Sequence, residues 1–244
     1  MSGHSHAKTI AHDKGIADQK RGAAFSKMIR LITVAVKEGG PNPDINARLR
    51  MALDMAKGIN MPKDNVERAI ARATGAGEGQ VFSDFLFEGM GPGNVALLVE
   101  GITDNKNRAV NDIKTILNQN GGKMVGEGAV RWMFERKGLV IIKLDDQAPE
   151  MKNKETLEME TIDAGADDIY WYENILEVHT PPENAEAVKK ALEVKNIKVE
   201  SFSLAWLAKE EIEGDEKIKE QNERLMEKLN DNDSVQEVYS NLKD

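Results

Sequence analysis

The spacing of apolar residues changes at a glycine-rich segment, residues 75–80 (GAGEGQ). Before this segment, apolar side chains such as Met28, Ile32 and Val36 recur at the spacing of amphipathic helices. After it, FSDFLFEG and NVALLVEGI have the period near two that is typical of strands. The change predicts a helical domain followed by α+β structure.

Three helices are predicted in the first part. The first occupies residues 21–40, the second begins near Asp44 with Ile45 in its apolar stripe, and the third follows Pro62, with capping-box spacing between Asp64 and Glu67. Their other faces carry Lys and Arg. We therefore expect a small helical bundle with a basic outer surface.

The next section predicts the order β-β-α-β. FSDFLFEG and NVALLVEGI form a hairpin through GMGPGN, a helix capped by Asp104 follows, and AVRWMFERKG returns as a strand. The alternative for the glycines of GMGPGN is a phosphate-binding loop. The spacing favours the hairpin, because a strand rather than a helix N-terminus comes next.

From Gly138 onward the pattern is β-α-β-β-α-β, the ferredoxin-like order. A helix and one final strand, SVQEVYSNL, follow. A lone strand is not stable, so it must join a sheet formed earlier in the chain. We expect an α+β fold of three domains: a helical bundle at 1–80, a middle α+β domain at 81–137 plus 204–244, and an inserted ferredoxin-like domain at 138–203.

Charge is unevenly distributed along the chain. The formal net charge is −9, yet residues 1–75 hold 13 Lys and Arg against 7 Asp and Glu, while the remainder holds 20 against 35. A basic module on an acidic body is typical of a protein that directs one end towards a polyanion. The alternative is an ordinary gradient of solvated surface charge.

The polar N-terminal stretch is suited to nucleic acid, because its lysines can follow a phosphate backbone and its histidines can stack on bases. The alternative is a solvated leader. In the glycine-rich stretch GGKMVGEGAV, Lys123 is a candidate loop residue for contact with a backbone phosphate. The predicted nucleic-acid-binding residues are His4, His6, Lys8, His12, Lys14, Lys20, Arg21, Lys27, Arg30 and Arg50.

The sequence favours few other chemistries. There is no cysteine, which excludes disulfides and thiolate chemistry and suggests a cytoplasmic location. No secretion signal or membrane span is predicted. His4, His6 and His12 lack the companion ligands of a metal site, and His179 is interpreted as structural. No catalytic motif occurs, so we expect no enzyme, cofactor, metal or small-molecule substrate.

Several motifs, in order, resemble the YebC/PmpR family, which includes a mitochondrial translational activator of cytochrome oxidase subunit I. They are GHS, KRG, NARLR, NMPKDNVERAI, FEGMGPGNVALLVE, TDNKNR, MFERKG and VQEVYSNL, and they cover essentially the whole chain. The resemblance implies three domains and a phosphate-facing N-terminal domain. Two departures, at His6-Ala7 and Asp13, remove a stacking ring and a cation that the family usually has.

The resemblance implies one of two nucleic acids. Bacterial members are commonly described as probable DNA-binding transcriptional regulators. The mitochondrial branch and more recent views of bacterial members point instead to a translation factor that binds ribosomal RNA near the catalytic centre of the ribosome and relieves stalling. The sequence leaves both open. A protein-interaction module remains a further hypothesis, and an enzyme on the ferredoxin-like unit is the least favoured.

Overall fold

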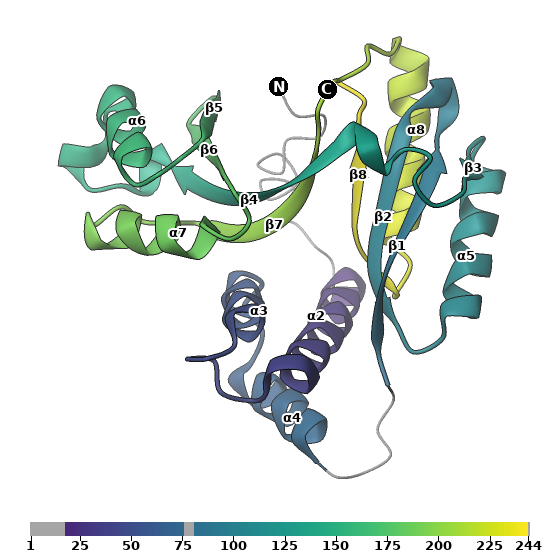
Figure 1. Ribbon diagram of the computed structural model, residues 1–244, viewed down its shortest axis with the longest axis horizontal. Helices are drawn as coiled ribbons and strands as arrows, with labels where there is room; N and C mark the ends of the chain where they lie inside the picture. The colour runs from purple at the N-terminus through teal and green to yellow at the C-terminus, as the bar shows by residue number, and fades with distance from the viewer. Residues whose placement is uncertain (1–17, 76–80, 244) are drawn as a thin grey trace. The chain divides into compact units, whose positions relative to one another are not determined.

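The computed structural model describes residues 18–75 and 81–243 (Figure 1). Their contacts divide them into two compact units. Residues 136–206 form one unit, and residues 18–75, 81–135 and 207–243 form the other. Among the described residues, no helix combines the length and apolarity needed to span a membrane.

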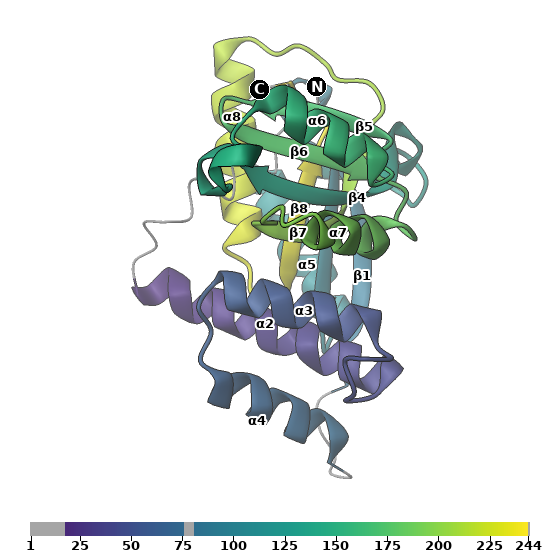
Figure 2. The ribbon, with the colours of Figure 1, turned by 90° about the vertical axis from the view of Figure 1, so that its left-hand side faces the viewer.

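Residues 18–75 form the helical segment, with helices α2 (Asp18–Gly39), α3 (Ala47–Gly58) and α4 (Lys63–Thr74). Helix α2 packs against both α3 and α4 around a core that includes the fully buried Ile32 and Leu49. The C-terminal ends of α2 and α4 lie at the same end of the segment (Figure 2). The three helices predicted from apolar spacing are therefore confirmed.

Two local predictions in the helical segment are wrong. Ile45 precedes α3 and its exposed fraction is 80%. The helix instead begins at Ala47, after its buried N-cap residue Asn46, whose Oδ1 accepts a 3.0 Å hydrogen bond from the Leu49 backbone N–H. Helix α4 has Pro62 at its N-cap and no side-chain cap, so Asp64 and Glu67 form no capping box.

The first sheet is antiparallel, with strand order β3-β1-β2-β8. The final strand of the chain, β8, pairs with β2, as expected of a strand that is not stable alone. Helices α5 and α8 cover one face of this sheet (Figure 1), around a core that includes Leu97, Ile113 and Leu225. The elements are β1 (Ser83–Met90), β2 (Ala96–Thr103), α5 (Lys106–Gln119), β3 (Lys123–Met124), α8 (Glu216–Asn230) and β8 (Val235–Ser240).

The glycine-rich GMGPGN stretch is a hairpin turn, as predicted. Strands β1 and β2 pair on either side of it, and the Gly91 N–H donates to the Val95 carbonyl at 2.8 Å. Buried Asn222 of α8 donates from Nδ2 to the Pro92 carbonyl at 2.9 Å. A Cβ on Gly91 would lie 2.2 Å from the Asn222 Oδ1, so the close approach of α8 requires glycine there.

The second sheet has strand order β5-β6-β4-β7 and the predicted chain order β-α-β-β-α-β. Helices α6 and α7 cover one of its faces (Figure 2), where Leu157 and Leu192 pack on Val140 and Val178. The elements are β4 (Phe134–Lys143), α6 (Lys154–Asp163), β5 (Asp168–Tyr172), β6 (Ile175–Thr180), α7 (Ala185–Val194) and β7 (Ser201–Ala208).

The strand predicted at AVRWMFERKG is wrong in its first half. Arg131–Met133 form a 3-10 turn, and Phe134 begins β4, which belongs to the second sheet. The third strand of the first sheet is instead the short β3. The N–H groups of Val130 and Arg131 bind the side chain of Glu88, so they are not available to a sheet ladder.

Three separate hydrophobic cores are present in the described chain, one in the helical segment and one beside each sheet. A core of its own is a property of a domain. We propose that the three cores mark the three domains predicted above. Strands β4 and β7 extend across the boundaries drawn at 137/138 and 203/204.

Candidate nucleic-acid interface

Two predicted phosphate-binding residues of α2 contact an acidic turn of the same chain. Lys27 donates from Nζ to the Asn230 carbonyl at 2.6 Å, and Gln236 Nε2 donates back to the Lys27 carbonyl at 3.3 Å. Arg30 donates to the Asp233 carbonyl and lies 3.8 Å from the Asp233 carboxylate. We call residues 230–233, between α8 and β8, the acidic turn.

Burial changes the chemistry of Lys27. Desolvation lowers the pKa of its amine below the ordinary value of 10.5, and nearby Arg30 acts in the same direction. The carboxylates of Glu237, Asp231 and Asp233 partly oppose this by favouring the charged form. Lys27 is therefore a partly buried amine that is already engaged by the Asn230 carbonyl.

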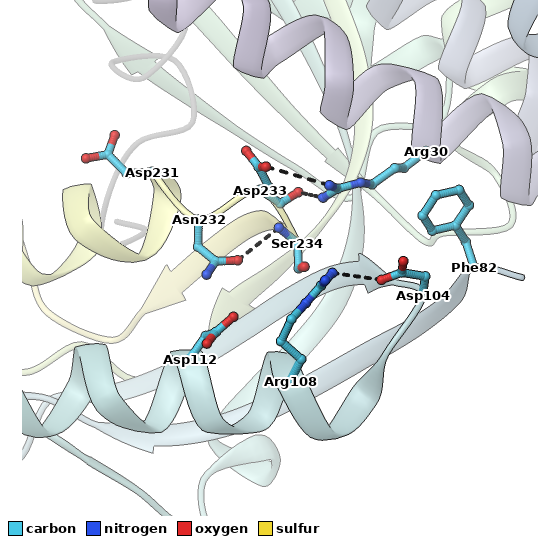
Figure 3. Close-up of a pocket in the computed structure, with 9 residues that line it drawn as sticks. All are labelled: Arg30, Phe82, Asp104, Arg108, Asp112, Asp231, Asn232, Asp233 and Ser234. Atoms are coloured by element: carbon cyan, nitrogen blue, oxygen red, sulfur yellow. Dashed lines mark hydrogen bonds and ion pairs between the residues drawn. The ribbon is translucent and has the colours of Figure 1, made fainter. Parts of the chain in front are cut away.

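A cavity of about 600 Å³ lies beside this contact (Figure 3). Its two arginines are both paired with carboxylates of the wall, Arg30 with Asp233 and Arg108 with Asp104 at 2.8 Å. Four aspartates against two arginines make the cavity unsuitable for a phosphate. Its lining residues are Arg30, Phe82, Asp104, Arg108, Asp112, Asp231, Asn232, Asp233 and Ser234.

Arg48 of α3 makes a second set of acidic contacts. Its guanidinium donates to Glu38 at 2.6 Å and to both carboxylate oxygens of Asp84 at 2.6 and 2.9 Å. Burial alone would lower the pKa of Arg48, but the hydrogen bonds and charges of the two carboxylates raise it overall. This arginine joins α3 to the end of α2 and to β1.

The basic residues without acidic partners lie elsewhere in the helical segment. Among the described residues, Lys37 and Arg72 form no ion pair or hydrogen bond, and both side chains are exposed. Arg68 is also exposed and donates only to the Asp64 carbonyl and the Asn65 amide oxygen. Lys37 lies in the last turn of α2 and Arg72 in the last turn of α4. The C-terminal ends of these two helices lie at the same end of the segment (Figure 2).

The other predicted residues divide by where they lie. Lys20 and Arg21 belong to the first turns of α2, and Arg50 donates to the Pro43 carbonyl. Lys123 is exposed in β3. The predicted residues outside the described part of the chain are His4, His6, Lys8, His12 and Lys14.

His179 has the structural environment that its sequence context predicted. It is buried in β6, with Nε2 2.7 Å from the Glu177 carboxylate. Within residues 18–75 and 81–243, no group of three or more His, Cys, Asp or Glu side chains is arranged to hold a metal ion.

Sequence reasoning missed Glu88, Arg48 and the acidic turn. Glu88 is buried, and its carboxylate accepts from the backbone N–H groups of Gly128, Val130 and Arg131 at 2.5 to 2.9 Å. The available signal was a carboxylate inside the apolar strand sequence FLFEGM. For Arg48 and the acidic turn no such signal exists, because their partners are distant in sequence.

Comparison with known proteins places this architecture in a family. The family model described as "TACO1/YebC protein N-terminal domain" matches residues 5–76, and the one described as "TACO1/YebC second and third domain" matches residues 82–242. Relatives include proteins named "Probable transcriptional regulatory protein", which is a regulator's name and not an enzyme's. One from Halothermothrix orenii is 43% identical and one from Desulfatibacillum aliphaticivorans is 44% identical.

These matches extend over nearly the whole length of each protein. The first covers 99% of this chain and 95% of the relative, and the second covers 98% and 95%. A crystal structure of a conserved hypothetical protein from Aquifex aeolicus superposes with a TM-score of 0.88 at 36% identity, over 98% of this chain and 97% of that one. The chain therefore belongs to the TACO1/YebC family.

Proposed function

We propose that this protein is a non-enzymatic regulator of gene expression that binds DNA through the end of the helical segment where α2 and α4 terminate. The observation that carries the proposal is that Lys37 and Arg72 are exposed there and have no acidic partner within residues 18–75 and 81–243. Cations of this kind contact phosphate and release counterions. The regulator names of the relatives support the same class of function.

The contacts of Lys27 and Arg30 refine which residues take part. Both are engaged by the acidic turn, so we assign the first encounter with phosphate to Lys37, Arg68 and Arg72. Phosphate contacts position a protein on nucleic acid but carry no sequence information. We therefore expect this interface alone to bind DNA with little sequence preference.

The test is a titration of fluorescent duplex DNA with the full chain at low salt. Replacing both Lys37 and Arg72 with Gln should weaken binding several-fold, because two phosphate contacts are lost. The control is the double change Lys152→Gln and Lys217→Gln, which removes the same charge from exposed positions outside the helical segment. Equal losses in the two double variants would reject the proposed interface.

A second candidate function is binding of ribosomal RNA, and the exposed Trp132 favours it, since exposed aromatic rings stack on unpaired bases. Crosslinking in cells followed by sequencing of recovered DNA and RNA separates the two. Enrichment at promoters supports the DNA proposal. Enrichment on ribosomal RNA supports the second candidate and contradicts the first.

A further inference from the structure

A buried carboxylate fixes the loop that follows β3. The loop comprises residues 125–133, and we call it the Trp132 loop. Glu88 of β1 binds three of its backbone N–H groups, at Gly128, Val130 and Arg131. Burial alone would raise the pKa of Glu88, but these donors outweigh it and lower that pKa below its ordinary value. The loop is therefore held by an ionised side chain.

A backbone hydrogen bond, buried side chains and a glycine conformation also order the loop. The Val125 N–H donates to the Glu88 carbonyl at 2.9 Å, and Val130 of the loop and Phe134, which follows it, are buried. Gly128 has φ of +81°, in the left-handed region that glycine adopts without strain. This backbone conformation brings the N–H of Gly128 to Glu88, at 2.5 Å.

This ordered loop exposes a large aromatic ring. The exposed fraction of Trp132 is 66%, although its indole Nε1 donates to the Ala129 carbonyl at 3.0 Å. The one polar atom of the ring is thus satisfied within the loop, and the exposed remainder is apolar. A tryptophan presented in this way is positioned for stacking, because little side-chain freedom remains to be lost on binding.

The surroundings of the ring suit an unpaired strand of nucleic acid. Lys123 and Arg131 are exposed and lie near Trp132 in the sequence, and the charge of Arg131 also acts on Glu88. A Cβ on Gly126 or Gly128 would meet no atom within 4 Å, so the loop backbone is open to close approach. Glu127 is also exposed and repels phosphate, which favours contact through a base rather than through the backbone.

We propose that Trp132 is a stacking platform for an unpaired nucleic-acid base. The proposal rests on the proposed nucleic-acid-binding function and adds a second contact to it. Base stacking tolerates any sequence, since every base has a π face, and it requires that the base be outside a duplex. The Trp132 loop therefore selects unpaired strands.

The experiment measures binding of a twelve-nucleotide oligo(dT), an oligo(U) of the same length and a duplex DNA to the full chain. Trp132→Ala should weaken binding of the single strands about tenfold, and Trp132→Phe, which keeps a ring, should retain most of the affinity. Duplex binding should change little. Because stacking is not ionic, the slope of log affinity against log salt should be the same in Trp132→Ala and the unsubstituted protein.

Three results separate this inference from the function on which it rests. If the unsubstituted protein binds none of the three probes at low salt, the proposed function fails, and the inference with it. If it binds them and Trp132→Ala binds single strands equally well, only the stacking inference is overturned. If it binds the duplex but neither single strand, the stacking inference is overturned while the proposed function stands. Thermal unfolding checks that each variant is folded.

Discussion

Lys27 of α2 donates a 2.6 Å hydrogen bond to the carbonyl of Asn230, at the beginning of the acidic turn. Together with the Arg30–Asp233 contact, it engages two cations of the basic helical segment with the acidic turn of the same unit. The carboxylates near Lys27 and Arg30 attract these cations, as the phosphate groups of a nucleic acid would. The acidic turn is therefore expected to compete with nucleic acid for the central part of α2.

Replacing Asp231 and Asp233 with Asn should tighten binding of duplex DNA about threefold and steepen its salt dependence, because about one further phosphate contact becomes possible. Asp233 is 67% exposed, and an ion pair of this kind adds little stability. The control, Glu150→Gln with Glu155→Gln, removes two exposed negative charges from residues 136–206. If both pairs tighten binding equally, net charge alone explains the effect.

Lys27 should make stability depend on pH in alkaline solution. Its pKa in the folded protein is below 10.5, so between these two values the unfolded chain binds more protons. The stability of the protein relative to Lys27→Met should therefore rise as the pH increases through the folded pKa, and level off above 10.5. Urea unfolding of both proteins from pH 8 upward measures this difference. A difference independent of pH would contradict the assignment of Lys27 as a desolvated amine.

Glu88 should produce the opposite dependence in acid. Its pKa in the folded protein lies below the ordinary value of 4.5, so its stabilising effect is complete above that value and is lost as the pH falls through the folded pKa. At pH 7, Glu88→Gln should lower the free energy of unfolding by about 2 kcal/mol, because charged hydrogen bonds to three N–H groups are weakened. The stability gap between the two proteins should shrink below pH 4.5. A constant gap would show that the carboxylate charge does not hold the Trp132 loop.

The geometry of Arg48 predicts a difference between two substitutions. Arg48→Lys keeps the charge but loses the paired hydrogen bonds to Asp84, and Arg48→Ala loses both. The side chains of Arg48, Glu38 and Asp84 are all partly exposed. We therefore expect Arg48→Ala to lower the free energy of unfolding by only about 1 kcal/mol. Most of that loss should already occur in Arg48→Lys. Chemical unfolding measures it, and full stability in Arg48→Lys would show that charge alone matters.

The sequence predicted those features of the fold that depend on local spacing. Apolar periodicity located α2, α3 and α4, and the isolation of the last strand predicted that it joins a sheet formed earlier, which β8 does by pairing with β2. Ile45 and AVRW were misassigned because an apolar residue fits a helix or strand pattern even where Asn46 or Glu88 supplies a competing hydrogen bond. Local spacing contains no information about such bonds.

The candidate interface was less predictable than the fold. A count of lysines and arginines identifies a basic segment, but it does not distinguish Lys37 and Arg72 from Lys27 and Arg30. The partners of Lys27 and Arg30 lie 203 residues away in the sequence, so only the folded chain reveals which cations are already engaged. Trp132 was missed for a similar reason, because a strand pattern gives no sign that its ring is exposed.

The most direct test of the account is the salt dependence of duplex DNA binding by the full chain. If Lys37, Arg68 and Arg72 each meet a phosphate, the slope of log affinity against log salt concentration should be about −2.7, at roughly 0.9 per phosphate contact. Replacing Lys37 and Arg72 with Gln removes two phosphate contacts and should make that slope shallower by about 1.8. A slope near zero, or one that these substitutions leave unchanged, would contradict the claim that this end of the helical segment binds nucleic acid.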